Sequence, residues 1–517
     1  MRRYLPMRKI SKPSLLQNTA INYAGQAYAM LVGILIQPFY LGHLGAETYG
    51  LIGFFAVLQT WLQLLDVGIS GSLVREIAHS QGQSNSKASS GRQLLRSLEC
   101  LFIPISASAF ISIYAGSAWI SQHWLDVRAL DPSTVTQCVG LMGLMISLRL
   151  LATLYKSGVQ GLELHGWINA VNVLIATLRY FGGLALVIWY SQDALDFFLF
   201  QAVIALAEML IFAMKAYSLL PGSLLLGFNW ERVKPLVPFA ASMSLTSILW
   251  IALTQLDKLV LSKVLPLGEY GYFSLVALIS TGIFSLTNPL VQALLPRMTV
   301  LLSEGQTSAM ENLYRNAARF AAALLLPLAG VIAVHGEALV YAWTGDTVSA
   351  KWCGPILFWY ALGAALLALS QFQFYLQYIH GQLRLHVIYS LVSAAISIPV
   401  VVLSIFYWGA YGAALAWFVL RSITFVIWAP VVHARFAPGL HKIWQNDLLL
   451  IVAGTILGLL VSKVLYNQIN PTGRFTVFLT LMLGGAITLC SVALSMFASA
   501  PKQALSRIFS RTAKFND

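Results

Sequence analysis

Four basic side chains lie inside long apolar stretches of the sequence, where an ionised group is costly and is usually kept for a function. Arg179 and Arg421 lie near the middle of their stretches. Arg149 and Lys258 lie nearer the ends, where a long side chain can extend toward polar surroundings. Because a guanidinium group binds phosphate oxygens through two parallel hydrogen bonds, we expect Arg179 and Arg421 to line a cavity for an anion. For Arg149 and Lys258, cavity lining and structural pairing stay equally open.

One acidic residue, Glu208, also lies deep in an apolar stretch. It shares a helical face with Gln201 and Lys215, because the three recur at seven-residue steps. A carboxylate in this place is a candidate for binding a coupling ion. The alternative is a structural pair with Arg179.

The first apolar stretch carries one face of small and polar residues. Its members recur at steps of three or four, so they align on one side of a helix, and they are Asn18, Asn22, Gln26, Ala29, Gly33 and Gln37. Hydrocarbon cannot satisfy an amide, so this face must meet protein or water. Asn22 and Gln26 are therefore candidate substrate-binding residues, with helix packing through small residues as the equal alternative.

The composition shows what surrounds these residues. Of 517 residues, 58% are hydrophobic and only 10% are charged, and the mean hydropathy is +0.74. A soluble domain carries about 25% charged residues, and one membrane crossing needs about 20 apolar residues. We predict an all-α polytopic membrane protein with about fourteen transmembrane helices. The four cysteines form no CxxC pair, so neither a disulfide framework nor a metal site is expected, and no cofactor is implied.

The apolar stretches divide the chain into two parallel six-helix bundles followed by two C-terminal helices. The expected organisation is a basic cytoplasmic N-terminus at 1–16, an N-terminal lobe at 17–219, a cytoplasmic linker at 220–235, a C-terminal lobe at 236–430, a second cytoplasmic linker at 431–446, two additional transmembrane helices at 447–498 and a basic cytoplasmic tail at 499–517. No loop is long enough to fold as a soluble domain, so binding must occur among the helices.

The distribution of basic residues predicts the orientation. Lys and Arg number 32 against 19 Asp and Glu. With fourteen crossings, the outer loops hold only Arg128, Lys263, Lys351, Lys463 and Arg474. Because cytoplasmic loops are the ones enriched in Lys and Arg, we expect both termini in the cytoplasm. The same bias explains the net charge without a nucleic-acid partner and favours contact with anionic membrane lipids.

An internal repeat recurs at an offset of 221 residues. Tyr49-Gly50 recurs as Tyr270-Gly271, and the polar loop Leu162–His165 recurs as Leu383–His386. The repeat unit contains an even number of helices, so its two copies have the same orientation in the membrane. Parallel repeats of this kind are typical of transporters that alternate access between their halves.

Two groups of motifs carry a resemblance to a known family. Tyr40–Leu51, Leu64–Ser70 and Arg75–Ala78 open the first half, and Gln255–Lys263 with Gly268–Gly271 opens the second. Together they resemble bacterial polysaccharide flippases of the Wzx type. That family belongs to the multidrug/oligosaccharidyl-lipid/polysaccharide exporter superfamily, which also contains multidrug exporters and lipid II flippases. The motif residues Asp66 and Asp257 are expected to cap helices or pair with loops.

The resemblance implies a flippase of O-antigen, lipopolysaccharide or exopolysaccharide biosynthesis. Such a protein moves an oligosaccharide on undecaprenyl pyrophosphate from the inner to the outer leaflet of the bacterial inner membrane by alternating access, and ion coupling is expected. Its partners are the lipid-linked glycan, membrane lipids and other polysaccharide assembly proteins. Arg179 and Arg421 would then hold the anionic pyrophosphate.

Several other functions compete with this one. A multidrug or cation antiporter of the same superfamily would need an acidic cavity, whereas here basic residues outnumber acidic ones deep in the stretches. The basic N-terminal signature of lipid II flippases is not found. A membrane glycosyltransferase or polymerase would need acidic residues on sizeable outer loops, so we expect no enzyme. The sequence also lacks the GxxxxGK[ST] loop that an ATP-driven exporter would need.

Overall fold

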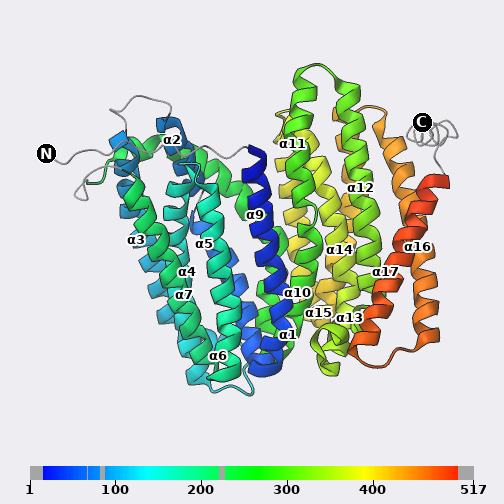
Figure 1. The fold of residues 1–517 in the computed structure, drawn as a ribbon, viewed down its shortest axis with the longest axis horizontal. Coiled ribbons are helices and arrows are strands. Elements are labelled where there is room, and N and C mark those ends of the chain that lie inside the picture. The colour runs from blue at the N-terminus through cyan, green and yellow to red at the C-terminus, as the bar shows by residue number, and fades with distance from the viewer. Residues whose placement is uncertain (1–14, 67, 82–87, 221–226, 499–517) are drawn as a thin grey trace, which may run out of the picture. The chain divides into compact units, whose positions relative to one another are not determined.

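The computed structural model describes residues 15–66, 68–81, 88–220 and 227–498 (Figure 1). All regular secondary structure within these ranges is helical, which confirms the predicted all-α class. The basic tail expected at 499–517 and nearly all of the N-terminus expected at 1–16 lie outside the described residues.

The chain divides into two compact units, and unit 1 comprises Met1–Leu44, Leu62–Ser121 and Asp131–Leu245. Its helices are the first part of α1 (Leu15–Leu62), then α2 (Ile69–Gln81), α3 (Ala88–Trp119), α4 (Pro132–Gln160), α5 (His165–Thr177), α6 (Gly183–Trp189), α7 (Ala194–Leu219), α8 (Trp230–Val233) and the start of α9 (Val237–Val264). Short π-helical segments follow α3 at Ile120–Trp124 and α5 at Leu178–Gly182.

Unit 2 comprises Gly45–Trp61, Gln122–Leu130 and Thr246–Asp517. Besides the ends of α1 and α9 it contains α10 (Leu267–Ser285), α11 (Asn288–Ser303), α12 (Thr307–Val334), α13 (Gly336–Thr344), α14 (Thr347–Ile379), α15 (Arg384–Phe436), α16 (Leu440–Ile469) and α17 (Arg474–Ala498).

Helix α4 is the centre of unit 1, where it packs against both α3 and α7. In a membrane, burying apolar side chains does not drive helices together, because lipid is as apolar as the protein interior. Such helices are held together by close packing, which small residues permit. At Gly143 on α4, an added Cβ would lie 2.9 Å from the Ile113 side chain of α3. A glycine is therefore required for this approach.

Helix α14 has the same central place in unit 2, with α10, α12, α13 and α15 around it. The C-terminal pair α16 and α17 pack on each other, and a side chain at Gly458 would overlap the backbone of Thr488. Arg315 of α12 joins α16 through two hydrogen bonds to the Asp447 carboxylate, at 2.6 and 3.0 Å. Helices α16 and α17 are thus joined to the rest of unit 2 both by packing and by an ion pair.

Two helices are too long for one membrane crossing. α1 has 48 residues and α15 has 53, which is roughly 72 and 80 Å of helix against a hydrocarbon core of about 30 Å. Each contains one glycine in a conformation that L side chains rarely adopt, Gly45 at φ +80° and Gly409 at φ +57°, and is two helices joined there. Eleven described segments are long and apolar enough to cross a membrane. Counting the two kinked helices twice and adding α9 gives fourteen crossings in the described chain.

The internal repeat has a structural counterpart. Thr60 and Thr281, one offset apart, each donate a hydrogen bond from Oγ1 to the carbonyl four residues earlier, at 2.8 Å in both copies. Gly45 and Pro266 also occupy equivalent positions, and each immediately precedes a helical segment that carries the repeated Tyr-Gly pair. The two halves therefore share local geometry as well as sequence.

The repeated Tyr-Gly pairs allow two helical segments of unit 2 to approach closely. A side chain at Gly50 would overlap the carbonyl oxygen of Leu267, and one at Gly271 would overlap the carbonyl oxygen of Ala46. Only glycine permits backbone contact at both positions.

Loop 122–130 is held in unit 2 by hydrogen bonds to its backbone. The Glu47 carboxylate accepts hydrogen bonds from three successive N–H groups, those of residues 128–130, at 2.8–2.9 Å. The Asp126 carbonyl accepts a hydrogen bond from the Leu267 N–H at 2.8 Å. These contacts explain why the loop and residues 45–61 group with unit 2, although the sequence suggests an unbroken lobe over 17–219.

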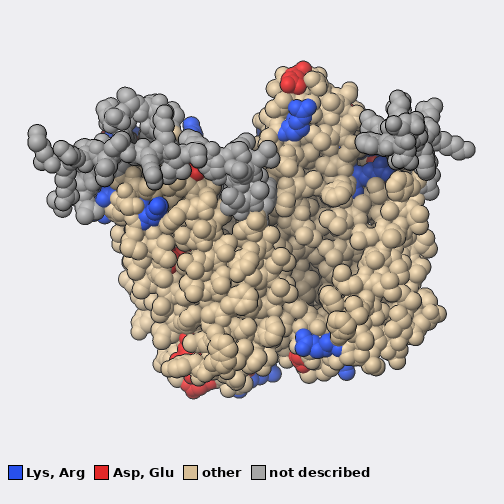
Figure 2. Space-filling view, viewed as in Figure 1, with Lys and Arg blue, Asp and Glu red and all other residues tan. Residues whose placement is uncertain are grey.

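The surface of the helices suits a lipid environment. In the view of Figure 2, Lys, Arg, Asp and Glu gather near the helix ends, and the middle of the visible face is almost free of them. Aromatic pairs with exposed rings mark helix ends: Trp189 and Tyr190 lie at the end of α6, and Tyr407 and Trp408 lie at the α15 kink. Trp and Tyr are typical of the membrane–water interface.

Helices extend further than the apolar stretches suggest. The segment 431–446, expected as a linker, is helical except for residues 437–439 between α15 and α16. α12 begins at Thr307, ahead of its apolar stretch. Hydropathy reports only the part of a helix inside the hydrocarbon, so the polar turns beyond it are missed.

Candidate functional site

Arg179 lies in the π-helical segment Leu178–Gly182 between α5 and α6. Such a segment leaves backbone carbonyls without their usual helical donors. Two side chains satisfy them here: Gln201 donates from Nε2 to the Arg179 carbonyl at 3.0 Å, and Tyr40 donates from its hydroxyl to the Tyr180 carbonyl at 2.8 Å. The backbone that carries Arg179 is therefore fixed from α7 and α1.

The Arg179 guanidinium forms an ion pair with Glu208 of α7, at 2.7 Å between NH2 and Oε2. Both side chains keep some access, 23% exposed for Arg179 and 18% for Glu208. The pair matches the structural alternative for Glu208, and Gln201 on the same helical face also binds Arg179. Lys215, the third residue of that face, instead places its ammonium 5.1 Å from the Trp167 ring.

Two further basic side chains from α4 lie within electrostatic range of this pair. Arg149 and Lys156 each interact with the charges of both Arg179 and Glu208. The Lys156 ammonium donates a hydrogen bond to Asn172 Oδ1 at 3.1 Å. Unit 1 thus gathers three basic groups around one carboxylate. We define Arg149, Lys156, Arg179 and Glu208 as the cationic cluster.

Lys156 was not among the residues predicted from the sequence. It follows directly after an apolar stretch and so was expected in a loop, but α4 continues to Gln160 and keeps it partly buried. A basic residue directly after an apolar stretch, together with a polar residue such as Asn172 in the next stretch, is the sequence signal that would have indicated it.

The face of small and polar residues predicted in the first apolar stretch lies on α1, and part of it packs against other helices. The side chain of Asn22 lies outside the described residues, and Gln26 is exposed. Gly33 packs against the Tyr180 hydroxyl, which would lie 3.0 Å from an added Cβ. Tyr28, beside the stripe, shares a hydrogen bond of 2.7 Å with Thr177 of α5. Part of this helix face therefore serves packing on α5, and Gln26 remains accessible.

Arg421 of α15 lies in unit 2 among backbone and aromatic partners. Its NH2 group donates to the Leu253 carbonyl of α9 at 2.7 Å. The guanidinium carbon lies 4.6 Å from the centre of the Trp417 ring. Among the described residues, no carboxylate lies within ion-pair distance of Arg421, so none of them neutralises its charge.

Asp257 and Lys258 form a buried polar group with Tyr360 in unit 2. The Lys258 ammonium donates to the Thr254 carbonyl at 2.6 Å and lies 3.4 Å from Asp257 Oδ1. The Tyr360 hydroxyl donates to Asp257 Oδ2 at 2.6 Å. Lys258 is only 9% exposed, so it does not extend toward the helix end. Asp257 likewise pairs inside the unit instead of capping a helix, because Tyr360 and Lys258 satisfy its carboxylate there.

Asp66 caps the start of α2, accepting a hydrogen bond from the Ser70 backbone at 3.2 Å, as the sequence suggested. No group of three or more His, Cys, Asp or Glu side chains that could hold a metal ion occurs among the described residues.

The fold is that of a multi-pass helical membrane protein. The structure resembles that of the lipid II flippase MurJ in an inward closed conformation, with a TM-score of 0.68 and 11% identity over 93% of this chain and 98% of that one. It also resembles an inward-facing multidrug resistance MATE family transporter of the MOP superfamily, with a TM-score of 0.59 and 13% identity over 80% of this chain and 98% of the other. At these identities the likeness shows the fold.

Sequence comparison gives the family. The model of a family described as polysaccharide biosynthesis protein matches residues 15–302, which is more than half of the chain. The chain belongs to this polysaccharide biosynthesis protein family. It is also 21% identical over 290 residues to the "Putative O-antigen transporter" of Shigella flexneri, covering 55% of this chain and 67% of that protein.

Proposed function

We propose that the protein is a flippase that moves undecaprenyl-pyrophosphate-linked oligosaccharide repeat units from the inner to the outer leaflet of the bacterial inner membrane. It works by alternating access driven by an ion gradient, and it does no chemistry on its cargo. Membership of the polysaccharide biosynthesis family and the fold shared with a lipid II flippase support this cargo class. Its partners are the lipid-linked glycan, membrane lipids and other polysaccharide assembly proteins.

The excess of positive charge in the cationic cluster carries the proposal. Arg149, Lys156 and Arg179 face a single carboxylate, Glu208, among membrane-spanning helices. Three basic side chains with one carboxylate give this region a net positive charge, and charge at membrane depth is usually kept for a function. A pyrophosphate supplies a matching anion and suits the planar fork of arginine. Glu208 is the candidate residue that binds the coupling ion during the alternating-access cycle.

The sign of this charge separates the flippase from a multidrug or cation antiporter with the same fold. An antiporter for cations would place excess carboxylates around its cargo, because like charges repel and opposite charges bind. The cationic cluster would repel such a cargo and attract a phosphate-bearing one. A lipid II flippase also carries a pyrophosphate, so the glycan distinguishes these two cargoes.

Deleting the gene in its own host tests the proposed function. We expect one surface glycan to disappear and its lipid-linked precursor to accumulate on the cytoplasmic side, with both defects reversed by the intact gene. Normal surface glycan together with increased sensitivity to cationic drugs would instead establish the antiporter. A defect in cell-wall synthesis with normal surface glycan would point to lipid II.

The proposed topology can be tested separately, with reporter fusions that report their side of the membrane. The split of basic residues predicts cytoplasmic reporters after Ser80, Leu226 and Ala500, and an external reporter after Trp124. An external result at Ala500 with the other three as expected would contradict the count of fourteen crossings.

A further inference from the structure

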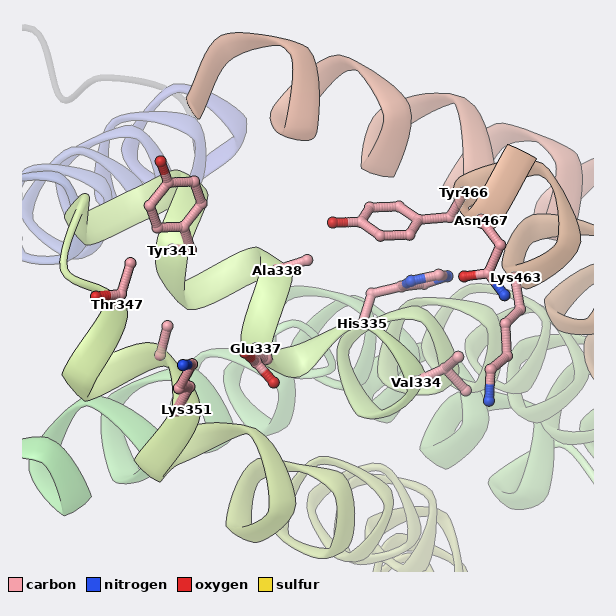
Figure 3. Close-up of a pocket in the computed structure, with 11 residues that line it drawn as sticks. Val334, His335, Glu337, Ala338, Tyr341, Thr347, Lys351, Lys463, Tyr466 and Asn467 are labelled. Atoms are coloured by element: carbon pink, nitrogen blue, oxygen red, sulfur yellow. The ribbon is translucent and has the colours of Figure 1, made fainter. Parts of the chain in front are cut away.

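A cavity of about 380 Å³ lies in unit 2, apart from Arg421 and the Asp257–Lys258 pair (Figure 3). It is bordered by the end of α12, by α13, by the start of α14 and by the last turns of α16. Its polar lining includes Lys351, Lys463, Glu337, His335, Tyr341 and Tyr466. A concave site of this volume with a few polar groups is typical of a small ligand or headgroup.

The cavity lies at the depth where membrane-spanning segments end. The apolar segment Thr307–Val334 ends at its wall, and the segment Thr347–Ile379 begins there. Residues at such ends lie level with lipid headgroups rather than with acyl chains. We therefore expect the ligand of this cavity to be a molecule that is present at the membrane–water interface.

The two lysines of the lining are exceptions to the charge bias of the chain. Lys351 and Lys463 are two of the five basic residues expected on the outer side, where lysine is normally avoided. Neither forms an ion pair with a described carboxylate. Arg474, another of the five, is occupied, because it donates from NH2 to the Trp343 carbonyl at the end of α13, at 2.7 Å. No ion pair within the described residues neutralises either lysine, so both can attract an anion.

One wall of the cavity is formed by buried, uncharged side chains. His335 is buried, its Nε2 lies 3.1 Å from the Ser462 hydroxyl of α16, and its ring lies 5.1 Å from that of Tyr466. Burial and the neighbouring Lys463 lower the pKa of His335, so its imidazole is neutral at pH 7. The positive charge of the cavity therefore comes from the two lysines alone.

Glu337 adds a negative charge between them. It lies in the first turn of α13, is exposed, and forms no ion pair with a described basic residue. In Figure 3 it lies on α13 between Lys351 and Lys463. Two ammonium groups with a carboxylate between them complement a ligand that carries a phosphate and an amine close together.

We propose that this cavity binds the headgroup of a zwitterionic phospholipid, with its phosphate attracted by the lysines of the lining and its ammonium group held at Glu337. The proposal rests on the cavity alone and holds for any cargo. Bound lipid would join α16 to α13 and α14, and so tie the C-terminal helix pair to the rest of unit 2.

Binding of short-chain lipids to the purified full-length protein in detergent tests the proposal. The probes are dihexanoyl phosphatidylethanolamine, dihexanoyl phosphatidylglycerol and inorganic phosphate, measured by native mass spectrometry and calorimetry. We expect phosphatidylethanolamine to bind more tightly than the other two. The double variant Lys351→Gln, Lys463→Gln should weaken this binding at least tenfold, since it loses both charge-assisted contacts. Lys263→Gln, another outer lysine but one outside the lining, should leave binding unchanged.

Glu337→Gln distinguishes the amine from the phosphate. It should remove the preference for phosphatidylethanolamine over phosphatidylglycerol while binding of both lipids persists. Equal binding of inorganic phosphate and lipid would identify free phosphate as the ligand and overturn the headgroup. Failure of all three probes to bind, or unchanged lipid binding in the double lysine variant, would overturn the site itself.

Discussion

Removing the charge of Arg179 should lower glycan export at least tenfold even when the protein is stable. Arg179→Ala by itself removes the ion-pair partner of the partly buried Glu208, which destabilises the protein, so its amount in the membrane should fall. The double variant Arg179→Gln, Glu208→Gln removes both charges and keeps the shapes. We expect it to reach the membrane in normal amount and still to lose export at least tenfold, because the contact to the cargo phosphate is gone.

The double variant separates the two roles of the ion pair. Normal export by Arg179→Gln, Glu208→Gln would mean that the pair is structural only. Glu208→Gln alone keeps the guanidinium, so loss of export in that variant at normal protein amount would assign ion coupling to Glu208. Lys215→Ala is the matched control, since it removes a charge from the same helical face without touching the cationic cluster.

Arg421→Ala should also impair export, by roughly tenfold to a hundredfold, as expected when a charge-assisted contact of about 1.5–3 kcal/mol to phosphate is lost. Arg421 has no carboxylate partner among the described residues, so no buried charge is left behind and the protein should accumulate normally. Arg421→Lys should recover part of the activity, because it keeps the charge but loses the planar fork over Trp417. Export is measured as surface glycan per amount of protein.

Arg435→Ala is a suitable control for Arg421, because Arg435 lies on the same helix but is exposed and donates its hydrogen bonds to the Gln382 side chain. If Arg421→Ala disappears from the membrane while Arg435→Ala does not, the contact with the Leu253 carbonyl is structural. If Arg421→Ala exports normally at native amount, Arg421 does not bind the cargo.

The all-α fold class and the membrane crossings could be predicted from the sequence. The crossings follow from local hydropathy, and glycines mark where the two longest helices are divided. Gly45 and Gly409 divide helices that are otherwise continuous, and the apolar stretches end at each of them. The repeated Tyr-Gly pairs were recognised as motifs in the sequence. Only the three-dimensional structure shows why glycine is needed there, which is the backbone contact between Gly50 and Leu267.

The candidate site was predicted in part. Charge at membrane depth identified Arg179, Arg149 and Glu208, since an ion inside an apolar stretch is visible in the sequence. Lys156 was missed because it lies just beyond such a stretch, and hydropathy does not show that α4 continues past it. The direction in which Lys258 extends was also unpredictable, because its contact with Thr254 depends on the packing of α9 against Tyr360 and Trp417.

Translocation in reconstituted vesicles tests the central claim most directly. Purified protein is placed in liposomes with the undecaprenyl-pyrophosphate-linked glycan of its own host, and an added enzyme that cannot cross the bilayer cleaves the glycan exposed outside. With an ion gradient, protein-containing vesicles should expose the whole pool, whereas empty vesicles and the Arg179→Gln, Glu208→Gln variant should expose only the outer-leaflet share. Equal exposure in vesicles with and without the protein, under gradients of either proton or sodium, would contradict the account.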